Sequence, residues 1–111
     1  MSVKINVDLD QVGGGVVASG SIVRYGVRSL PNPTKFIFTT EVYRSQQDID
    51  NGEDSINLKV VENSYSIPLD TPLVATPTIS IVGDIGALLD QVMKDVLEAI
   101  PEIGVGNVEI I

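Results

Sequence analysis

Residues 84–101 read DIGALLDQVMKDVLEAIP, and this stretch decides the fold. Its apolar residues recur at spacings of three and four, which predicts an amphipathic helix with one wide apolar face. These residues are Ile85, Leu88, Leu89, Val92, Met93, Val96, Leu97, Ala99 and Ile100. We expect Asp84 to cap the helix at its N-terminus and Pro101 to end it. A face this wide needs a broad apolar partner, and the rest of the chain can supply only a sheet.

Strand patterns recur along the rest of the chain, either as apolar–polar alternation or as β-branched and aromatic runs. They cover residues 3–9, 16–28, 35–44, 55–62, 64–71 and 78–82. Gly20 and Gly26 interrupt the second pattern and predict bulges or bends. The apolar tail, residues 103–111, predicts either an edge strand within the chain's own sheet or a strand added to a neighbour's sheet.

These patterns predict a mainly β (α+β) fold. We expect an antiparallel sandwich or barrel of about six to seven strands with one C-terminal amphipathic helix. The chain has 111 residues, so residues 1–111 are expected to form a single domain around one core. Within the polar segment 45–54, the pair Asn51-Gly52 predicts a tight turn, which would make residues 36–60 a long hairpin arm.

Composition excludes several kinds of site. The absence of cysteine and histidine removes thiolate nucleophiles, His-dependent triads and the usual zinc ligands. The glycines at 13–15 match part of a dinucleotide fingerprint, but a β-branched strand follows them instead of the required helix. Most carboxylates fit solvated positions, such as Asp90, which has the i,i+4 spacing of an ion pair with Lys94. We therefore predict no enzyme, no catalytic residue, no cofactor and no metal site.

The acidic segment 48–54 leaves one metal alternative open. Its four carboxylates could coordinate calcium, and they belong to Asp48, Asp50, Glu53 and Asp54. An EF-hand loop needs glycine at its sixth position and glutamate at its twelfth, and this segment has neither in place. An irregular calcium site therefore remains as the alternative to an exposed loop.

Charge is distributed unevenly along the chain. The formal net charge is −8, yet residues 1–44 hold five basic and three acidic side chains, and residues 45–111 hold two basic and twelve acidic ones. The acidic total argues against nucleic acid as the main partner. The acidic charge can serve solubility alone. The alternative is a polarised subunit whose basic part meets the acidic part of the next. The expected interface comprises Arg24, Arg28, Arg44, Asp48, Asp50, Glu53 and Asp54, with the apolar Val108, Ile110 and Ile111 of the tail.

Two stretches carry a resemblance to known proteins: KFIFTTEVYRSQQDIDNGEDSINLKVVE at 35–62 and DIGALLDQVMKDVLEAI at 84–100. As a strand–loop–strand unit and a helix, they resemble small structural proteins of tailed bacteriophages, such as neck, ring or tail-tube subunits. The resemblance is one of architecture and composition, and it transfers no functional residue. It implies a non-enzymatic subunit that self-assembles into a ring or tube. Its partners would be copies of itself and other structural proteins.

The sequence also bears on location. No apolar run approaches the roughly 20 residues that a membrane-spanning helix needs, and the alternating N-terminus does not resemble a signal peptide. We therefore expect a virion or cytoplasmic protein with no secretion signal and no membrane span.

Two other functions stay open. A cytoplasmic ligand- or peptide-binding module would be a monomer with a sizeable apolar pocket between helix and sheet. A calcium-binding β-domain would lose thermal stability when a chelator removes the metal.

Overall fold

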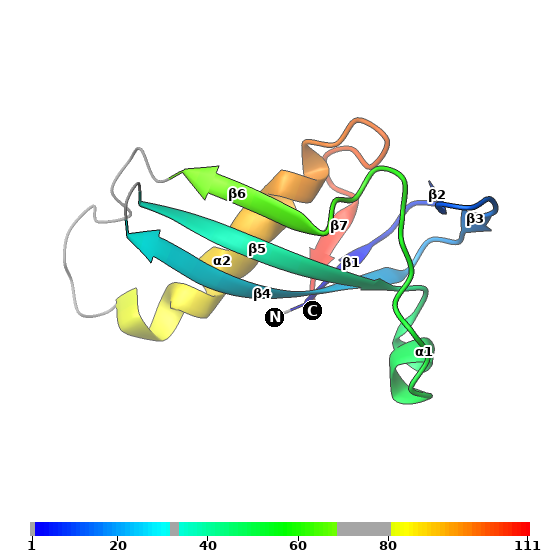
Figure 1. Cartoon of the computed structure of the whole chain (residues 1–111), viewed down its shortest axis with the longest axis horizontal. Coiled ribbons are helices and arrows are strands. Elements are labelled where there is room, and N and C mark those ends of the chain that lie inside the picture. Colours follow the sequence, from blue (N-terminus) through cyan, green and yellow to red (C-terminus); the bar gives the residue numbers. More distant parts are fainter. Residues whose placement is uncertain (1, 32–33, 69–80) are drawn as a thin grey trace.

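A computed structural model describes residues 2–31, 34–68 and 81–111 of the chain. Its elements, in chain order, are β1 (Ser2–Ile5), β2 (Leu9–Asp10), β3 (Val16–Val17), β4 (Ser21–Pro31), β5 (Thr34–Tyr43), α1 (Gln46–Asp50), β6 (Ser64–Pro68), α2 (Ile81–Glu98) and β7 (Val108–Ile110). Five strands form an antiparallel sheet in the order β6-β5-β4-β1-β7, and β2 pairs with β3 in a second sheet (Figure 1). The predicted mainly β fold is confirmed. The described strands form no closed barrel, because β6 and β7 end the five-stranded sheet.

The hairpin of β4 and β5 contains the two longest strands of the sheet. The two strands pair in continuous register from Ile22 opposite Tyr43 to Pro31 opposite Thr34. The predicted strand at 16–28 is split, because Gly20 has a φ of +111° and separates β3 from β4. Gly26 pairs regularly with Thr39 opposite it, so the strand has no bulge there.

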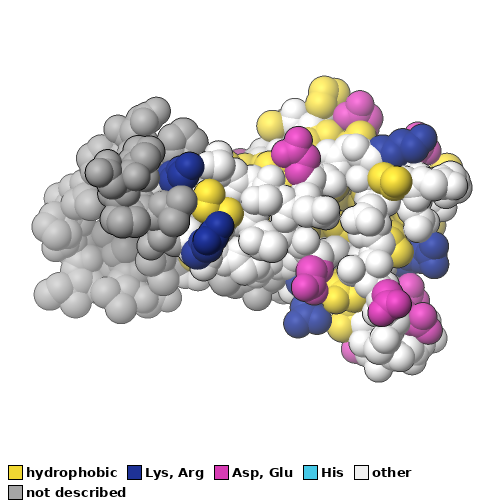
Figure 2. Space-filling view, in the orientation of Figure 1, with side chains coloured by type: hydrophobic (Ala, Val, Ile, Leu, Met, Phe, Trp, Pro, Cys, Tyr) yellow, Lys and Arg dark blue, Asp and Glu magenta, His cyan; other side chains and the backbone are white. Residues whose placement is uncertain are grey.

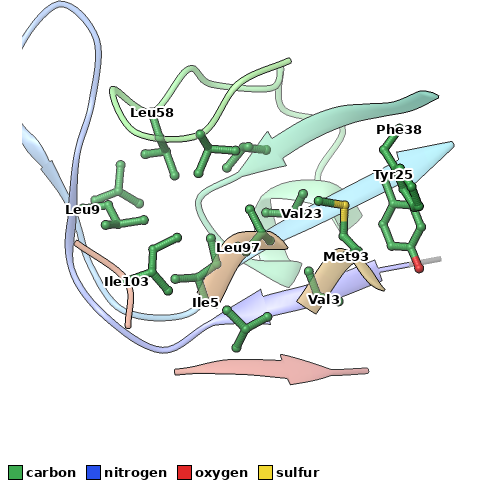
Figure 3. Close-up of a cluster of buried hydrophobic side chains, with 14 residues drawn as sticks. Val3, Ile5, Leu9, Val23, Tyr25, Phe38, Leu58, Met93, Leu97 and Ile103 are labelled. Atoms are coloured by element: carbon green, nitrogen blue, oxygen red, sulfur yellow. The ribbon is translucent and has the colours of Figure 1, made fainter. Parts of the chain in front are cut away.

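Helix α2 packs across one face of the five-stranded sheet (Figure 1). Met93 and Leu97 of the helix are 0 % exposed, and the sheet meets them with side chains such as Val3 and Phe38, also 0 % exposed (Figure 3). Burying each of these side chains contributes about 1.5–3 kcal/mol. Leu9 and Val17 of the small β2–β3 sheet belong to the same cluster, so the two sheets share one core.

The predicted helix is confirmed, but its ends differ from the prediction. Helix α2 begins at Ile81, so Asp84 lies inside the first turn and is not the N-cap. At the other end α2 stops at Glu98, and the Ile100 N–H bonds to the Leu97 carbonyl in a tighter turn just before Pro101. The strand predicted at 78–82 is wrong for residues 81–82, which are helical, and residues 78–80 lie outside the described residues.

The predicted hairpin arm at 36–60 does not form. Residues after Arg44 make the short helix α1, whose N-cap is Ser45; its Oγ accepts a hydrogen bond from the Asp48 N–H at 3.2 Å. Ser-x-x-Asp is a helix-start pattern, and the Asn-Gly pair forms its turn where the resulting helix ends instead of joining two strands. The strand predicted at 55–62 is reduced to isolated bridges, and β5 pairs with β6 instead. Leu58 and Val61 turn into the core, where they are 3 % and 7 % exposed.

The tail pairs within its own chain. Strand β7 runs antiparallel to β1, with Lys4 opposite Glu109, so the first of the two predicted arrangements is confirmed. Neither described helix has the length and apolar character needed to cross a membrane.

Candidate functional site

The face of the sheet opposite α2 carries two of the basic residues that the sequence singled out, Arg24 and Arg28. Along β4, Arg24, Gly26 and Arg28 alternate with the core-facing Val23 and Tyr25, and so point to this open face. Figure 2 shows the open face, with acidic side chains gathered over α1 and basic ones both beside α1 and at the opposite end of β4 and β5. Arg28 and Lys35 lie toward the turn between β4 and β5, whereas Arg24 and Arg44 lie toward the end that carries the acidic α1.

A shallow depression lies in the middle of the open face. Its volume is about 360 Å³, and it is lined by Arg24, Tyr25, Gly26, Thr39 and Glu41. The space arises at Gly26, where an added Cβ would meet nothing within 4 Å. Its walls are a guanidinium, a hydroxyl and a carboxylate, and none of these is paired with a histidine or a thiol. The depression could therefore hold a polar group but has no activated nucleophile.

Arg24 and Glu41 are fixed by Tyr43. The Arg24 Cζ lies 6.0 Å from the centroid of the Tyr43 ring, and the Tyr43 hydroxyl donates a hydrogen bond to Glu41 Oε2 at 2.9 Å. That hydrogen bond is the main reason why the pKa of Tyr43 is raised above its usual value. Tyr43 therefore stays protonated at neutral pH.

The other predicted interface residues lie around α1. Arg44 ends the β5 region, and its Nη2 donates to Gln11 Oε1 at 3.0 Å. Asp48 and Asp50 belong to α1, and residues 53–54 follow it; all but the half-buried Asp48 are exposed. The sequence correctly predicted that these side chains lie at the surface. It did not predict that Arg44 would adjoin the acidic segment within one subunit.

Opposite charges rarely pair inside the subunit. Among the described residues the only ion pair is Lys94 Nζ with Glu98 Oε1, at 3.7 Å. Arg24, Arg28 and Arg44 are exposed and form no ion pair with any described acidic residue. Their charges are therefore accessible to a partner.

The tail residues of the predicted interface divide into two kinds. Val108 is 3 % exposed and packs into the core beside Ile5, the residue opposite it on β1. Ile110 and Ile111 are 41 % and 54 % exposed. Only these last two present apolar surface at the edge of the sheet.

A contact between Tyr25 and Asp90 was missed by the sequence analysis. Tyr25 is 7 % exposed, and its hydroxyl donates a hydrogen bond to Asp90 Oδ1 of α2. Asp90 was predicted to pair with Lys94, but Lys94 pairs with Glu98. Tyr25 shares its strand face with Val23 and Val27, and this parity could have shown that a buried hydroxyl needed a partner. The identity of the partner depends on how α2 lies over β4, which no local pattern records.

Burial is the largest cause of a strongly raised Tyr25 pKa, followed by the hydrogen bond to Asp90 and the negative charge of that carboxylate. The phenol therefore remains protonated at neutral pH and acts as a donor that ties α2 to the sheet. Tyr65 behaves similarly at the β6 edge, where burial raises its pKa and its hydroxyl accepts a hydrogen bond from the Glu62 N–H at 2.9 Å. Neither tyrosine is placed to act as a base.

Within residues 2–31, 34–68 and 81–111, no three acidic side chains lie close enough to hold a metal ion. Ser21, whose buried hydroxyl has no hydrogen-bond partner among the described residues, also has no histidine that could activate it. Comparison of the chain with protein-family models, curated proteins and solved structures finds no match.

Proposed function

We propose that the protein is a non-enzymatic structural subunit that self-assembles into a ring or tube, as a component of a tailed-phage particle. The observation that carries the proposal is the charge arrangement along β4 and β5. Arg28 stands opposite Ile37, three pairs before the turn end of the hairpin, and the acidic α1 follows Tyr43 at the other end. From Ile37 to Tyr43 the strand runs about 20 Å, well beyond the reach of an ion pair.

Separated charges of this kind favour contact between unlike patches. If the Arg28 end of one subunit meets the α1 end of the next, the contact is heterologous, and repetition closes a ring or extends a filament. Each exposed ion pair contributes about 0–1 kcal/mol, so the charges would fix register and speed encounter while apolar contacts hold the assembly. Arg24 and Arg44, which lie nearer the acidic segment of their own subunit, would assist at the border of the contact.

A charge exchange tests this contact. Replacing Arg28 by Glu should weaken each contact about two- to fivefold, the equivalent of one exposed ion pair. Adding Asp54→Arg to the same chain should restore assembly, because the new acidic and basic ends again attract. Lys59→Glu makes the same charge change at an exposed position outside the proposed contact, and should have no effect. The extent of assembly of each variant is measured as molar mass by light scattering. An Arg28 variant that assembles like the Lys59 control would refute the contact.

The binding-module alternative has less support. The space between α2 and the sheet, where its apolar pocket was expected, is filled by side chains such as Met93, Leu97 and Phe38, each 0 % exposed. A ligand would have to use the shallow, polar depression at Gly26 instead. Such a site buries little of a ligand's surface, whereas small-molecule sites usually bury most of it. Self-assembly is therefore the function that the geometry supports best.

A further inference from the structure

The outer edge of β7 has backbone groups that point away from the sheet. Asn6 N–H bonds to the Asn107 carbonyl at 2.7 Å, and Ile111 N–H bonds to the Ser2 carbonyl at 3.4 Å. With Lys4 opposite Glu109, these contacts show that 107, 109 and 111 direct their backbone groups toward β1. The residues between them, Val108 and Ile110, must then direct theirs outward. No partner for these outward groups is found among the described residues.

The two edges of the five-stranded sheet differ in how they are protected. In β6, the Asn63 carbonyl bonds to the Thr40 N–H, so the alternation makes Ser64, Ser66 and Pro68 the outward positions. Proline has no N–H to donate and is a common guard of edge strands. Strand β7 has no proline and no lysine. Ile110, whose backbone groups point away from β1, is 41 % exposed. The unguarded edge is therefore β7.

Apolar surface continues from this edge onto α2. Asp90 accepts a hydrogen bond from Tyr25 of β4, so the Asp90 flank of the helix faces β4. Strands β4 and β7 lie on opposite sides of β1. Val92 and Val96 lie on the other helix flank, which therefore faces the β7 edge, and both are only half-buried.

We propose that a second copy of this chain docks at the β7 edge, pairing β7 antiparallel with its own β7 across a two-fold axis. The proposal rests on the proposed self-assembly and names one of its contacts. In this register Val108 of one copy lies opposite Ile110 of the other, and each exchanges both backbone hydrogen bonds with its partner. Pairing of two three-residue strands alone buries less surface than a stable interface, which buries about 1,200–2,000 Å². Ile110, Val92 and Val96 of both copies would supply the remaining apolar area.

Pairing of two β7 strands brings two like charges together. Glu109 of each copy would face its own equivalent, and like charges directly opposite one another are destabilising. Lys4 stands opposite Glu109 on β1, on the same face of the sheet, and offsets this repulsion. Together with the heterologous contact proposed above, the two-fold contact would join two rings face to face.

Disulfide trapping tests the register, because the chain contains no cysteine of its own. In Glu109→Cys, the two new thiols would be opposite one another in a non-hydrogen-bonded pair, with Cα atoms about 4.5 Å apart, which suits a disulfide. Ile111→Cys is the matched control, since it is exposed on the same strand face. Its thiol would lie opposite residue 107 of the partner and about 13 Å from its own equivalent, too far for a disulfide.

Both variants are incubated with oxidised glutathione and separated without reductant. The expected result is a cross-linked dimer for Glu109→Cys and monomer for Ile111→Cys. Equal cross-linking of both variants, or no cross-linking at 109, would overturn the proposal. If cross-linking at 109 fails while the Arg28 and Asp54 exchange still controls assembly, only the β7 contact is refuted and the proposed function stands.

A second variant tests the same contact without forming a disulfide. Ile110→Pro removes an outward N–H from each copy but leaves the bonds to β1 in place. It should weaken the dimer about ten- to a hundredfold more than Ile110→Ala, which keeps the N–H and loses only apolar surface. Equal affinities of the proline and alanine variants, measured by analytical ultracentrifugation, would contradict strand pairing at this edge.

Discussion

Replacing Tyr25 by phenylalanine tests how α2 is held on the sheet. The substitution keeps the buried ring and removes only the hydroxyl that donates to Asp90. A hydrogen bond to a charged acceptor contributes about 1.5–3 kcal/mol, but the half-buried Asp90 can regain part of this from water. We therefore expect the free energy of unfolding to fall by about 1–2 kcal/mol. This corresponds to a decrease of roughly 4–9 °C in melting temperature.

A double-mutant cycle separates this hydrogen bond from other effects of the substitutions. Asp90→Ala and the double variant complete the cycle, and urea unfolding followed by circular dichroism gives the four free energies. We expect a coupling of about 1 kcal/mol between the two positions. A coupling of zero would show that the hydroxyl and the carboxylate do not stabilise each other, and the reasoning would fail.

The same hydrogen bond predicts a dependence on alkaline pH. The pKa of Tyr25 in the folded protein is raised above its ordinary value of 10.0, so the folded state holds this proton more tightly than the unfolded chain does. Its stabilising contribution is complete below pH 10 and is lost as the pH rises above that value. The stability gap between the native chain and Tyr25→Phe should therefore narrow above pH 10. Tyr43 and Tyr65 titrate in both proteins and cancel in the difference.

Three further outcomes follow from the fold. Leu97→Ala should lower the free energy of unfolding by about 2–5 kcal/mol in urea titration, since Leu97 is 0 % exposed against the sheet; a loss below 1 kcal/mol would contradict its place in the core. Gly20→Ala should cost about 1–2 kcal/mol by calorimetry, because its φ of +111° disfavours any side chain while the nearest atom, Lys4 Cε, is 3.8 Å away and not a clash. Chelator should leave the melting temperature unchanged, and a fall reversed by calcium would support the calcium-binding alternative.

The sequence predicted those elements whose own residues determine them. The apolar stripe of α2 and the β-branched and aromatic runs of β4 and β5 are long, and each agrees with one periodicity only. Their existence and type were predicted correctly. The ends of β5 were predicted to within one residue, but the start of α2 was not, because Asp84 is a good cap by composition and the helix nevertheless begins at Ile81.

Where two local signals competed, the sequence alone did not decide between them. Ser45 and Asp48 favour a helix start, and Asn51 with Gly52 favours a turn; both signals are used, the first by α1 and the second where α1 ends. The resulting helix left β5 free to pair with β6. A hairpin arm was the expected consequence of reading only the second signal.

The candidate surface was predictable only as a list of exposed side chains. Which of them share a face follows from strand register, and the separation of Arg28 from α1 depends on the full length of the β4–β5 pairing. The outward direction of Ile110 likewise follows from hydrogen bonds between β1 and β7, which join opposite ends of the chain. Long-range pairing of this kind leaves no local trace in one sequence.

Molar mass in solution, measured by light scattering across a salt series, tests self-assembly most directly. From about 0.05 to 1 M salt the screening length falls from over 10 Å to about 3 Å, which weakens contacts between exposed charges. We expect particles of several subunits at low salt and smaller ones at high salt, with dimers persisting longest. A single subunit mass at every salt and protein concentration would contradict the account.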